Sequence, residues 1–131
     1  NQVSLIARTP LCFGFLSGKI NKTTHFDKQD HRSRWSNRQI QNWIEGSKKV
    51  LSCKTDFSSQ TNTQFALRFC LSYSRVTTAI PGALNELEVK ENIKASDLGP
   101  LQDDEIQEAQ KTYHKFQFLF ENKNLKNNYE R

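Results

Sequence analysis

Two short runs of apolar residues are separated and followed by longer blocks in which apolar positions recur at helical spacing. Residues 3–7 (Val-Ser-Leu-Ile-Ala) are mostly apolar and lead to Pro10, and residues 76–80 (Val-Thr-Thr-Ala-Ile) are rich in β-branched side chains and lead to Pro81. Both runs predict strands. Because continuously apolar strands are typical of a parallel sheet covered on both faces, we expect both to be buried.

The blocks between the two predicted strands indicate two helices. Ser36 and Gln39 have the spacing of a capping box, which predicts a helix from this point to near Lys54. A second helix is expected from the break at residues 56–61 to about Ser72. Its apolar positions cover most of its circumference, so we expect this helix to be buried.

Two more helices are expected after the second strand. Asn85 is the predicted N-cap of the first, with Glu88 at the capping-box position. Asp103 is the predicted N-cap of the second. The expected inward-facing residues of these helices are Leu87, Val89 and Ile93, and then Ile106, Ala109, Tyr113, Phe116 and Phe120.

Two segments are polar and lack periodicity. Residues 20–35 predict a long surface loop, in which aromatic and basic residues alternate and could stack on a base. Packing of Trp35 against the following helix is the favoured interpretation for that residue. Residues 122–131 predict a polar C-terminal tail.

The order strand, helices, strand, helix, helix predicts an α/β fold with two parallel strands and about four helices. A two-stranded sheet is not an independent structure, so the missing strands are expected from upstream sequence or from another chain. The absence of Met from the sequence and the early first strand favour the C-terminal piece of a longer protein. Self-association that covers the sheet is the other possibility.

The charge and the cysteine content disfavour a nucleic-acid partner and a metal site. The net charge of +5 comes from scattered residues, which favours a solvated basic surface over a nucleic-acid partner. The three cysteines lack the spacing of a metal site, and Cys70 is expected in the core. No segment has the apolar length of a membrane span and no signal peptide is visible, so we expect a reducing, cytoplasmic setting without a membrane partner.

The loop after the first strand carries the candidate chemistry. Gly14 and Gly18 can let a backbone approach a ligand, and Ser17 and Lys19 offer a hydroxyl and a cation. Backbone N–H groups and a nearby ammonium suit a phosphate. An ordinary turn is the alternative for these residues taken one by one.

Several motifs, in order and with consistent spacing, resemble the C-terminal portion of the aldo-keto reductases. The strand and loop at residues 6–19 are similar to the seventh strand of that family and the loop after it, and residues 76–83 are similar to its eighth strand. The remaining similar segments are residues 26–32, 66–69, 91–92 and 101–105.

The resemblance implies that residues 1–121 are the C-terminal part of a (β/α)8 TIM barrel, with the tail 122–131 outside it. The family binds NADP(H) across the C-terminal ends of the strands and transfers hydride to aldehydes or ketones, so a small carbonyl compound is the implied substrate. By position, the implied cofactor-binding residues are Arg8, Thr9, Pro10, Leu11, Cys12, Gly14, Lys19, Arg32, Gly82, Leu84, Glu88, Glu91 and Asn92.

The resemblance divides these residues by role. The turn from Thr9 to Gly14 would line the pyrophosphate, with Lys19 binding the ligand or fixing the loop. Arg32 would lie near the adenosine, and Glu91 and Asn92 at the adenine edge.

Two positions depart from the family pattern. Leu84 stands where the family often has a basic residue or Ser, and Glu88 stands where it has a Gln near the adenosine 2′-phosphate. A carboxylate there would repel that phosphate, which brings in NAD as an alternative. NADP remains the favoured cofactor because Lys19 and Arg32 are retained.

The family's catalytic Tyr, Lys, Asp and His lie on earlier strands and loops, and no residue here matches them. His25, His31 and His114 are interpreted as solvated surface residues. The chain is therefore expected to supply part of a cofactor site and not to reduce carbonyls alone. The alternative function is a non-catalytic dinucleotide-binding module related to the same family.

Overall fold

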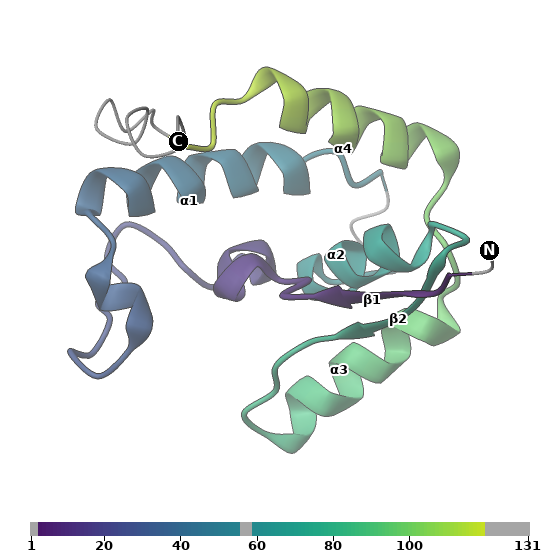
Figure 1. Cartoon of the computed structure of the whole chain (residues 1–131), viewed down its shortest axis with the longest axis horizontal. Coiled ribbons are helices and arrows are strands. Elements are labelled where there is room, and N and C mark those ends of the chain that lie inside the picture. The colour runs from purple at the N-terminus through teal and green to yellow at the C-terminus, as the bar shows by residue number, and fades with distance from the viewer. Residues whose placement is uncertain (1–2, 56–58, 120–131) are drawn as a thin grey trace, which may run out of the picture.

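The computed structural model describes residues 3–55 and 59–119, so the predicted tail and Phe120 lie outside the described residues. Two strands, two short 3-10 helices and four α-helices follow one another along the chain (Figure 1). They are β1 (Leu5–Arg8), η1 (Cys12–Ser17), η2 (His31–Arg34), α1 (Asn37–Leu51), α2 (Asn62–Leu71), β2 (Val76–Ile80), α3 (Glu86–Asp97) and α4 (Asp103–Lys115).

The two strands form a parallel pair, as the sequence predicted. Leu5 is aligned with Val76 and Arg8 with Ile80, with an irregularity directly after Leu5. The N–H of Leu5 donates to the carbonyl of Arg75 at 2.8 Å. Because the strands run in the same direction, the loops that follow them leave from the same edge of the sheet (Figure 1).

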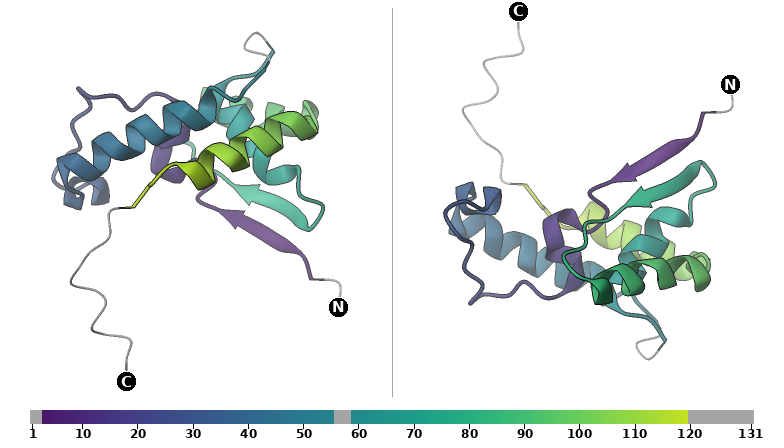
Figure 2. Two further views of the ribbon diagram at one scale, coloured as in Figure 1. Left: turned by 90° about the horizontal axis from the view of Figure 1, so that it is seen from above. Right: turned by 90° about the horizontal axis from the view of Figure 1, so that it is seen from below.

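The prediction that these strands are buried on both faces was wrong for the described chain. Leu5, Ile6 and Ile80 are each at least half exposed, at 50%, 58% and 58%. In the described part of the chain each strand pairs only with the other, and β1 lies at the margin of the molecule in both views of Figure 2. Helix α2 packs against β2, and the described residues supply too few further elements to cover both faces of the sheet.

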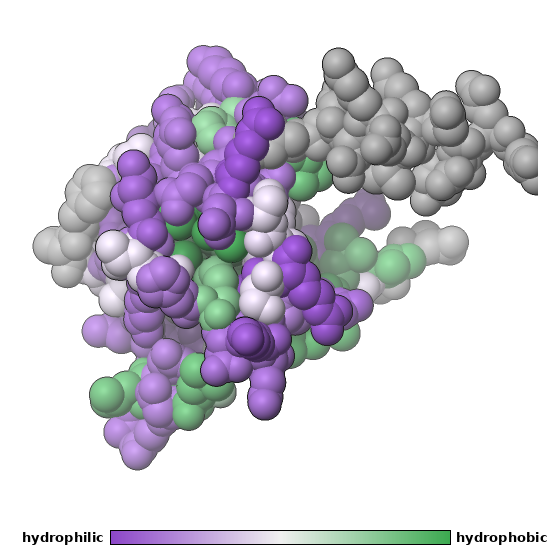
Figure 3. Space-filling model, turned by 90° about the vertical axis from the view of Figure 1, so that its left-hand side faces the viewer, coloured by the Kyte–Doolittle hydropathy of each residue, from purple (hydrophilic) through white to green (hydrophobic). Residues whose placement is uncertain are grey.

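The inward-facing residues predicted for α3 are also exposed. Leu87 and Ile93 are 77% and 60% exposed, and Val89 is 44% exposed. Figure 3 shows hydrophobic surface on the lower part of the molecule, where α3 lies, beneath a largely hydrophilic face. Helix α3 packs against α2, and its Ala95 is buried.

The core lies between the helices and η1 rather than around the sheet. One cluster joins Phe15 and Ile20 to Ile40 and Ile44 of α1. A second joins α1, α2 and α4 and consists of Leu51, Phe65, Leu101 and Ala109. Trp35 packs edge-on against Trp43 of α1 with ring centroids 4.7 Å apart, as predicted.

The helix starts follow the predicted caps with one exception. Ser36 Oγ accepts from the Gln39 N–H at 3.2 Å, and Asn85 Oδ1 accepts from the Glu88 N–H at 3.0 Å. Helix α4 is capped by Gln102 and not by Asp103, because the Gln102 N–H donates to the carboxylate of Glu105 at 3.3 Å.

Four further expectations need correction. The Gln39 side chain does not complete a capping box, because it donates to the Phe118 carbonyl at 2.8 Å instead. Helix α1 ends at Leu51 rather than near Lys54, and the loop 20–35 contains η2. Tyr113, predicted to face inward, is 60% exposed.

A buried polar network joins α2 to the start of α4. The Arg68 guanidinium donates to the carbonyls of Gly99 and Pro100 at 2.8 and 2.7 Å, and to Gln60 Oε1 at 2.6 Å. The buried carboxylate of Glu105 accepts from the N–H and hydroxyl of Thr55, both at 3.0 Å. Both side chains are thus satisfied by hydrogen bonds, which burial of charged groups requires.

Candidate functional site at the strand ends

The loop after β1 makes a tight turn with a left-handed backbone at several residues. Thr9, Cys12 and Phe13 have φ values of 54°, 46° and 57°, and Gly14 has 95°. The N–H groups of Cys12 and Gly14 donate to the carbonyls of Thr9 and Leu11, both at 2.9 Å. Left-handed φ is uncommon outside glycine and collects at functional turns, where successive N–H groups can form an anion-binding concavity.

The two glycines of this turn are required by its geometry. A Cβ on Gly14 would lie 3.4 Å from Arg32 Nη1, and a Cβ on Gly18, with φ of 75°, would lie 2.4 Å from Asn62 Nδ2. Ser17 Oγ donates to the Gly14 carbonyl at 2.7 Å and accepts from the Lys19 N–H at 3.2 Å. The turn from residue 14 to residue 19 is therefore closed by its own polar groups.

Arg32 holds η2 against this turn. Its guanidinium contacts both carboxylate oxygens of Asp30, with Nη2–Oδ2 at 2.6 Å, and Nη1 donates to the Phe13 carbonyl at 3.0 Å. The Phe26 ring lies under the guanidinium, 4.5 Å from Cζ to the ring centroid. Hydrogen bonds from the Arg32 side chain, and then from its N–H, lower the pKa of Asp30 to about 2.

An aromatic group surrounds Phe13, a residue that the sequence reasoning did not select. The Phe13 ring lies edge-on to His31 and Trp35, at centroid distances of 5.3 and 5.1 Å. His31, interpreted as a solvated residue, thus packs against two rings although its side chain is 56% exposed. The alternation of aromatic and basic residues in 26–35 was the available signal for this contact.

The loop after β2 meets the first loop through an ion pair. Lys19 Nζ lies 3.2 Å from Glu88 Oε1, and the Leu84 N–H donates to Glu88 Oε2 at 2.9 Å. The hydrogen bond from Leu84, and then that from Lys19, lowers the pKa of Glu88. The Leu84 side chain is 94% exposed.

The remaining predicted residues of α3 lie beside this ion pair. Asn92 is one helical turn beyond Glu88, on the same face, and its Nδ2 donates to the Gly82 carbonyl at 3.3 Å. The Glu91 carbonyl accepts from Gln64 Nε2 of α2 at 3.2 Å. Lys19 and Asn92 thus lie on the same side of the molecule, at the edge where both strands end.

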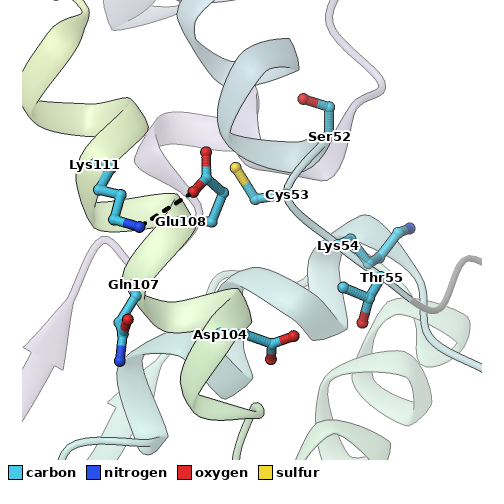
Figure 4. A pocket seen from close by; sticks show the side chains of 8 residues that line it. All are labelled: Ser52, Cys53, Lys54, Thr55, Asp104, Gln107, Glu108 and Lys111. Carbon is cyan, nitrogen blue, oxygen red and sulfur yellow. Dashed lines mark ion pairs between the residues drawn. The ribbon is translucent and has the colours of Figure 1, made fainter.

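Two pockets are lined mainly by polar residues. One, of about 480 Å³, is lined by Ser17 together with Lys54, Asn62 and Lys94 among others, and it adjoins the η1 turn. The other, of about 380 Å³, lies between the end of α1 and the side of α4 and contains none of the predicted site residues (Figure 4). Its Glu108 and Lys111 form an ion pair with atoms 3.7 Å apart.

Over residues 3–55 and 59–119, no group of three or more His, Cys, Asp and Glu side chains is placed to hold a metal ion. The helices of the described residues include none with the length and apolar character needed to cross a membrane.

The arrangement suits a phosphate-bearing ligand. It combines a left-handed turn, one ammonium and one guanidinium within two neighbouring loops. Both cations already carry a carboxylate partner, which fixes their positions and reduces their net charge.

The comparisons with known proteins agree on one family. Residues 1–114 match the model of the aldo/keto reductase family. A probable voltage-gated potassium channel subunit beta from Arabidopsis thaliana is 30% identical over 104 residues, which cover 76% of this chain and 31% of that protein.

Two solved structures of an aldo-keto reductase from Bacillus halodurans share the fold. The apo form has a TM-score of 0.54 at 22% identity, and the holo form has a TM-score of 0.57 at 21% identity. Each match covers 92% of this chain but only 37% and 36% of that protein. The chain therefore spans about a third of the length of the relatives it matches.

Proposed function

Because this chain belongs to the aldo/keto reductase family, we propose that it supplies the phosphate-binding and adenosine-binding end of a nicotinamide dinucleotide site. Its two parallel strands and their helices match a part of the (β/α)8 barrel of that family. The observation that carries the proposal is the ion pair between Lys19, on the loop after β1, and Glu88, in the first turn of α3 after β2. In such barrels the carboxyl ends of the strands carry the site.

The η1 turn is the proposed support for the pyrophosphate. Its left-handed residues from Thr9 to Gly14 turn the backbone sharply, and Gly14 leaves the space beside Arg32 without a side chain. Lys19 keeps 62% of its side chain exposed while paired with Glu88, so its ammonium remains accessible to a phosphate oxygen. The turn would therefore place a diphosphate beside the Lys19 ammonium.

The adenosine is proposed to lie between η2 and α3. Asp30 and Phe26 hold the Arg32 guanidinium in one plane, and a guanidinium fixed in this way can stack on a base. Gly82 has no atom near its would-be Cβ, so it permits close approach. Glu91 and Asn92 are the proposed contacts to the adenine edge.

Hydride transfer to an aldehyde or ketone is the proposed activity of the whole protein. The nicotinamide supplies the hydride when it is bound. The residues described here would hold and orient the dinucleotide, whereas the acid and base groups would come from other parts of the barrel. The carbonyl compound and the cytoplasmic setting are parts of the same proposal, and the three free cysteines accord with a reducing compartment.

A second candidate function is a non-catalytic dinucleotide-binding module. It is favoured by the 30% identity to the probable channel subunit beta from Arabidopsis thaliana. The two candidates differ in one measurement on the full-length protein, because only the enzyme would oxidise the reduced dinucleotide when an aldehyde is added.

The test of the proposed function is titration of the chain with NADPH and NADH, followed by the fluorescence of Trp35 and Trp43. We expect saturable binding that Lys19→Ala weakens about tenfold, because a charged hydrogen bond contributes about 1.5–3 kcal/mol. Lys111→Ala is the matched control, since Lys111 is an exposed lysine of α4 far along the chain from both loops. The proposal would be overturned if neither NADPH nor NADH bound to the chain.

A further inference from the structure

The pocket of about 480 Å³ that adjoins the η1 turn, which we call the lysine pocket, is built from four parts of the chain. Ser17 belongs to η1 and Lys54 follows the end of α1, while Asn62 begins α2 and Lys94 lies in the last turn of α3. Its volume is within the range of about 300–1,000 Å³ that is usual for small-molecule sites. The residues proposed to hold the dinucleotide are not among those that line it.

Within the described residues, the charged groups that line the lysine pocket have one sign. They are the ammonium groups of Lys54 and Lys94, and every other lining side chain is a hydroxyl or an amide. Two cations from different elements, with no carboxylate among these residues, favour an anion as the occupant. A phosphate monoester carries about two negative charges at neutral pH and accepts hydrogen bonds through three oxygens, so it matches two ammonium groups.

Lys54 is a buried lysine whose ammonium is held in place. The residue is 6% exposed, and its Nζ donates to Asn62 Oδ1 at 3.0 Å and to the Gln60 carbonyl at 3.3 Å. A charged group that is positioned before a ligand arrives loses little conformational entropy when the ligand binds. Lys94 is an exposed residue, so its longer reach can complete the contact from the other side of the pocket.

The start of α2 adds to the positive potential of the lysine pocket. Thr61 is the N-cap of this helix of 10 residues and Asn62 is its first residue, and both line the pocket. The N-terminus of a helix carries a partial positive charge that favours an anion. This contribution supports the two ammonium groups, which remain the observation that carries the inference.

We propose that the lysine pocket binds a small phosphorylated polyol, of the chemical class of the sugar phosphates. Lys54 and Lys94 would bind the phosphate, and the hydroxyl groups of Ser17 and Thr61 would contact the hydroxyl groups of the ligand. Inorganic phosphate would leave most of the volume unfilled, whereas an apolar ligand would leave the polar lining without hydrogen bonds. The inference goes beyond the proposed function, because the two sites share no residue.

The experiment is calorimetric titration of the full chain with glucose 6-phosphate, with inorganic phosphate and with glucose. The titrations are repeated on Lys94→Gln and on Lys54→Met, which each remove one ammonium group. Lys90→Gln is the matched control, since Lys90 lies one helical turn before Lys94 on α3, pairs with Glu86 at 2.7 Å and does not line the pocket. Circular dichroism checks the fold of each variant, and Lys94→Gln alone decides the test if the buried Lys54→Met does not fold.

We expect saturable binding of glucose 6-phosphate, about tenfold tighter than that of inorganic phosphate, and no saturable binding of glucose. Lys94→Gln should weaken the binding of glucose 6-phosphate about tenfold, because one charged hydrogen bond is lost, and Lys90→Gln should change it less than about twofold. Absence of glucose 6-phosphate binding would overturn the inference, and so would equal losses in Lys94→Gln and Lys90→Gln. Equal affinities for glucose 6-phosphate and inorganic phosphate would overturn the assignment of a polyol.

A competition titration separates the lysine pocket from the proposed dinucleotide site. We expect NADPH to leave the affinity for glucose 6-phosphate unchanged within about twofold. Mutual exclusion of the two ligands would place the sugar phosphate in the dinucleotide site and overturn the inference. Failure of NADPH to bind would overturn only the proposed function, because binding to the lysine pocket is measured without it.

Discussion

Lys19 lies on the loop after β1 and Glu88 lies in the first turn of α3, which follows β2, and their charged atoms are 3.2 Å apart. The sequence analysis presented Glu88 as a capping-box residue and as a charge that would repel a phosphate. The structure shows that it also ties the loop after β2 to the loop after β1. The Lys19 side chain is 62% exposed and that of Glu88 is 27% exposed, so the pair is accessible to solvent and to salt.

The ion pair is expected to position loops rather than to stabilise the fold. Exposed pairs contribute about 0–1 kcal/mol, so Lys19→Ala should lower the free energy of unfolding by less than about 1 kcal/mol. Amide hydrogen exchange should nevertheless speed up in residues 81–85, because Leu84 and the start of α3 lose their tether. A loss of stability well above 1 kcal/mol in urea denaturation would contradict this prediction.

Gly18 is expected to tolerate a methyl group less well than Gly82 does. Gly18→Ala places an L-residue at φ of 75° and a Cβ 2.4 Å from Asn62 Nδ2, which should cost about 1–2 kcal/mol of unfolding free energy. Gly82→Ala is the control for stability, because its Cβ would meet no atom within 4 Å. Thermal denaturation of both variants checks the difference, and equal melting temperatures would refute it.

Arg68→Lys tests the buried network. Lysine cannot reproduce the three hydrogen bonds to Gly99, Pro100 and Gln60, so these acceptors lose their donors. The free energy of unfolding should therefore fall by about 2–4 kcal/mol. Arg75→Lys, at an exposed arginine that precedes β2, should change the stability by less than about 0.5 kcal/mol. Urea denaturation of the two variants provides the measurement, and similar midpoints would argue against the network.

The stability of the loop 20–35 at low pH is expected to depend on Asp30. Its pKa is lowered from 3.8 to about 2 in the folded chain, chiefly by the Arg32 side chain. The contribution of the Asp30–Arg32 pair to the stability of the folded chain is therefore complete above about pH 4, and it is lost as the pH falls towards 2. A carbon-13 NMR titration of the Asp30 carboxyl should give a midpoint near 2. In Asp30→Asn, the NMR signals of the Phe26 ring should no longer change chemical shift on acidification. A midpoint near 3.8 would show that the pair is not formed in solution.

Local sequence signals predicted much of this fold because they act over a few residues. Ser36 and Asn85 cap their helices as expected, and the parallel pairing followed from two apolar runs with helices between them. The exposed state of Leu5 and Ile80 could not be predicted in this way, since burial depends on what covers a strand and not on the strand itself.

The candidate site was predicted as a set of positions but not as a set of contacts. The glycines signalled a turn, whereas the left-handed backbone of Thr9, Cys12 and Phe13 gave no sequence signal. The pairing of Lys19 with Glu88 joins residues far apart along the chain, so no local pattern could reveal it. Arg68 stood inside an apolar block, and that departure was the one available sign of the buried network.

The parallel pairing of β1 with β2 has a consequence for how the chain folds. The segment between the two strands contains α1 and α2, and all of it must be brought together before Leu5 can align with Val76. Local helices form on a microsecond scale, whereas closing a large loop carries an entropic penalty that slows long-range strand pairing. We therefore expect the strand-end loops to meet late in folding, after the helices between the strands have formed.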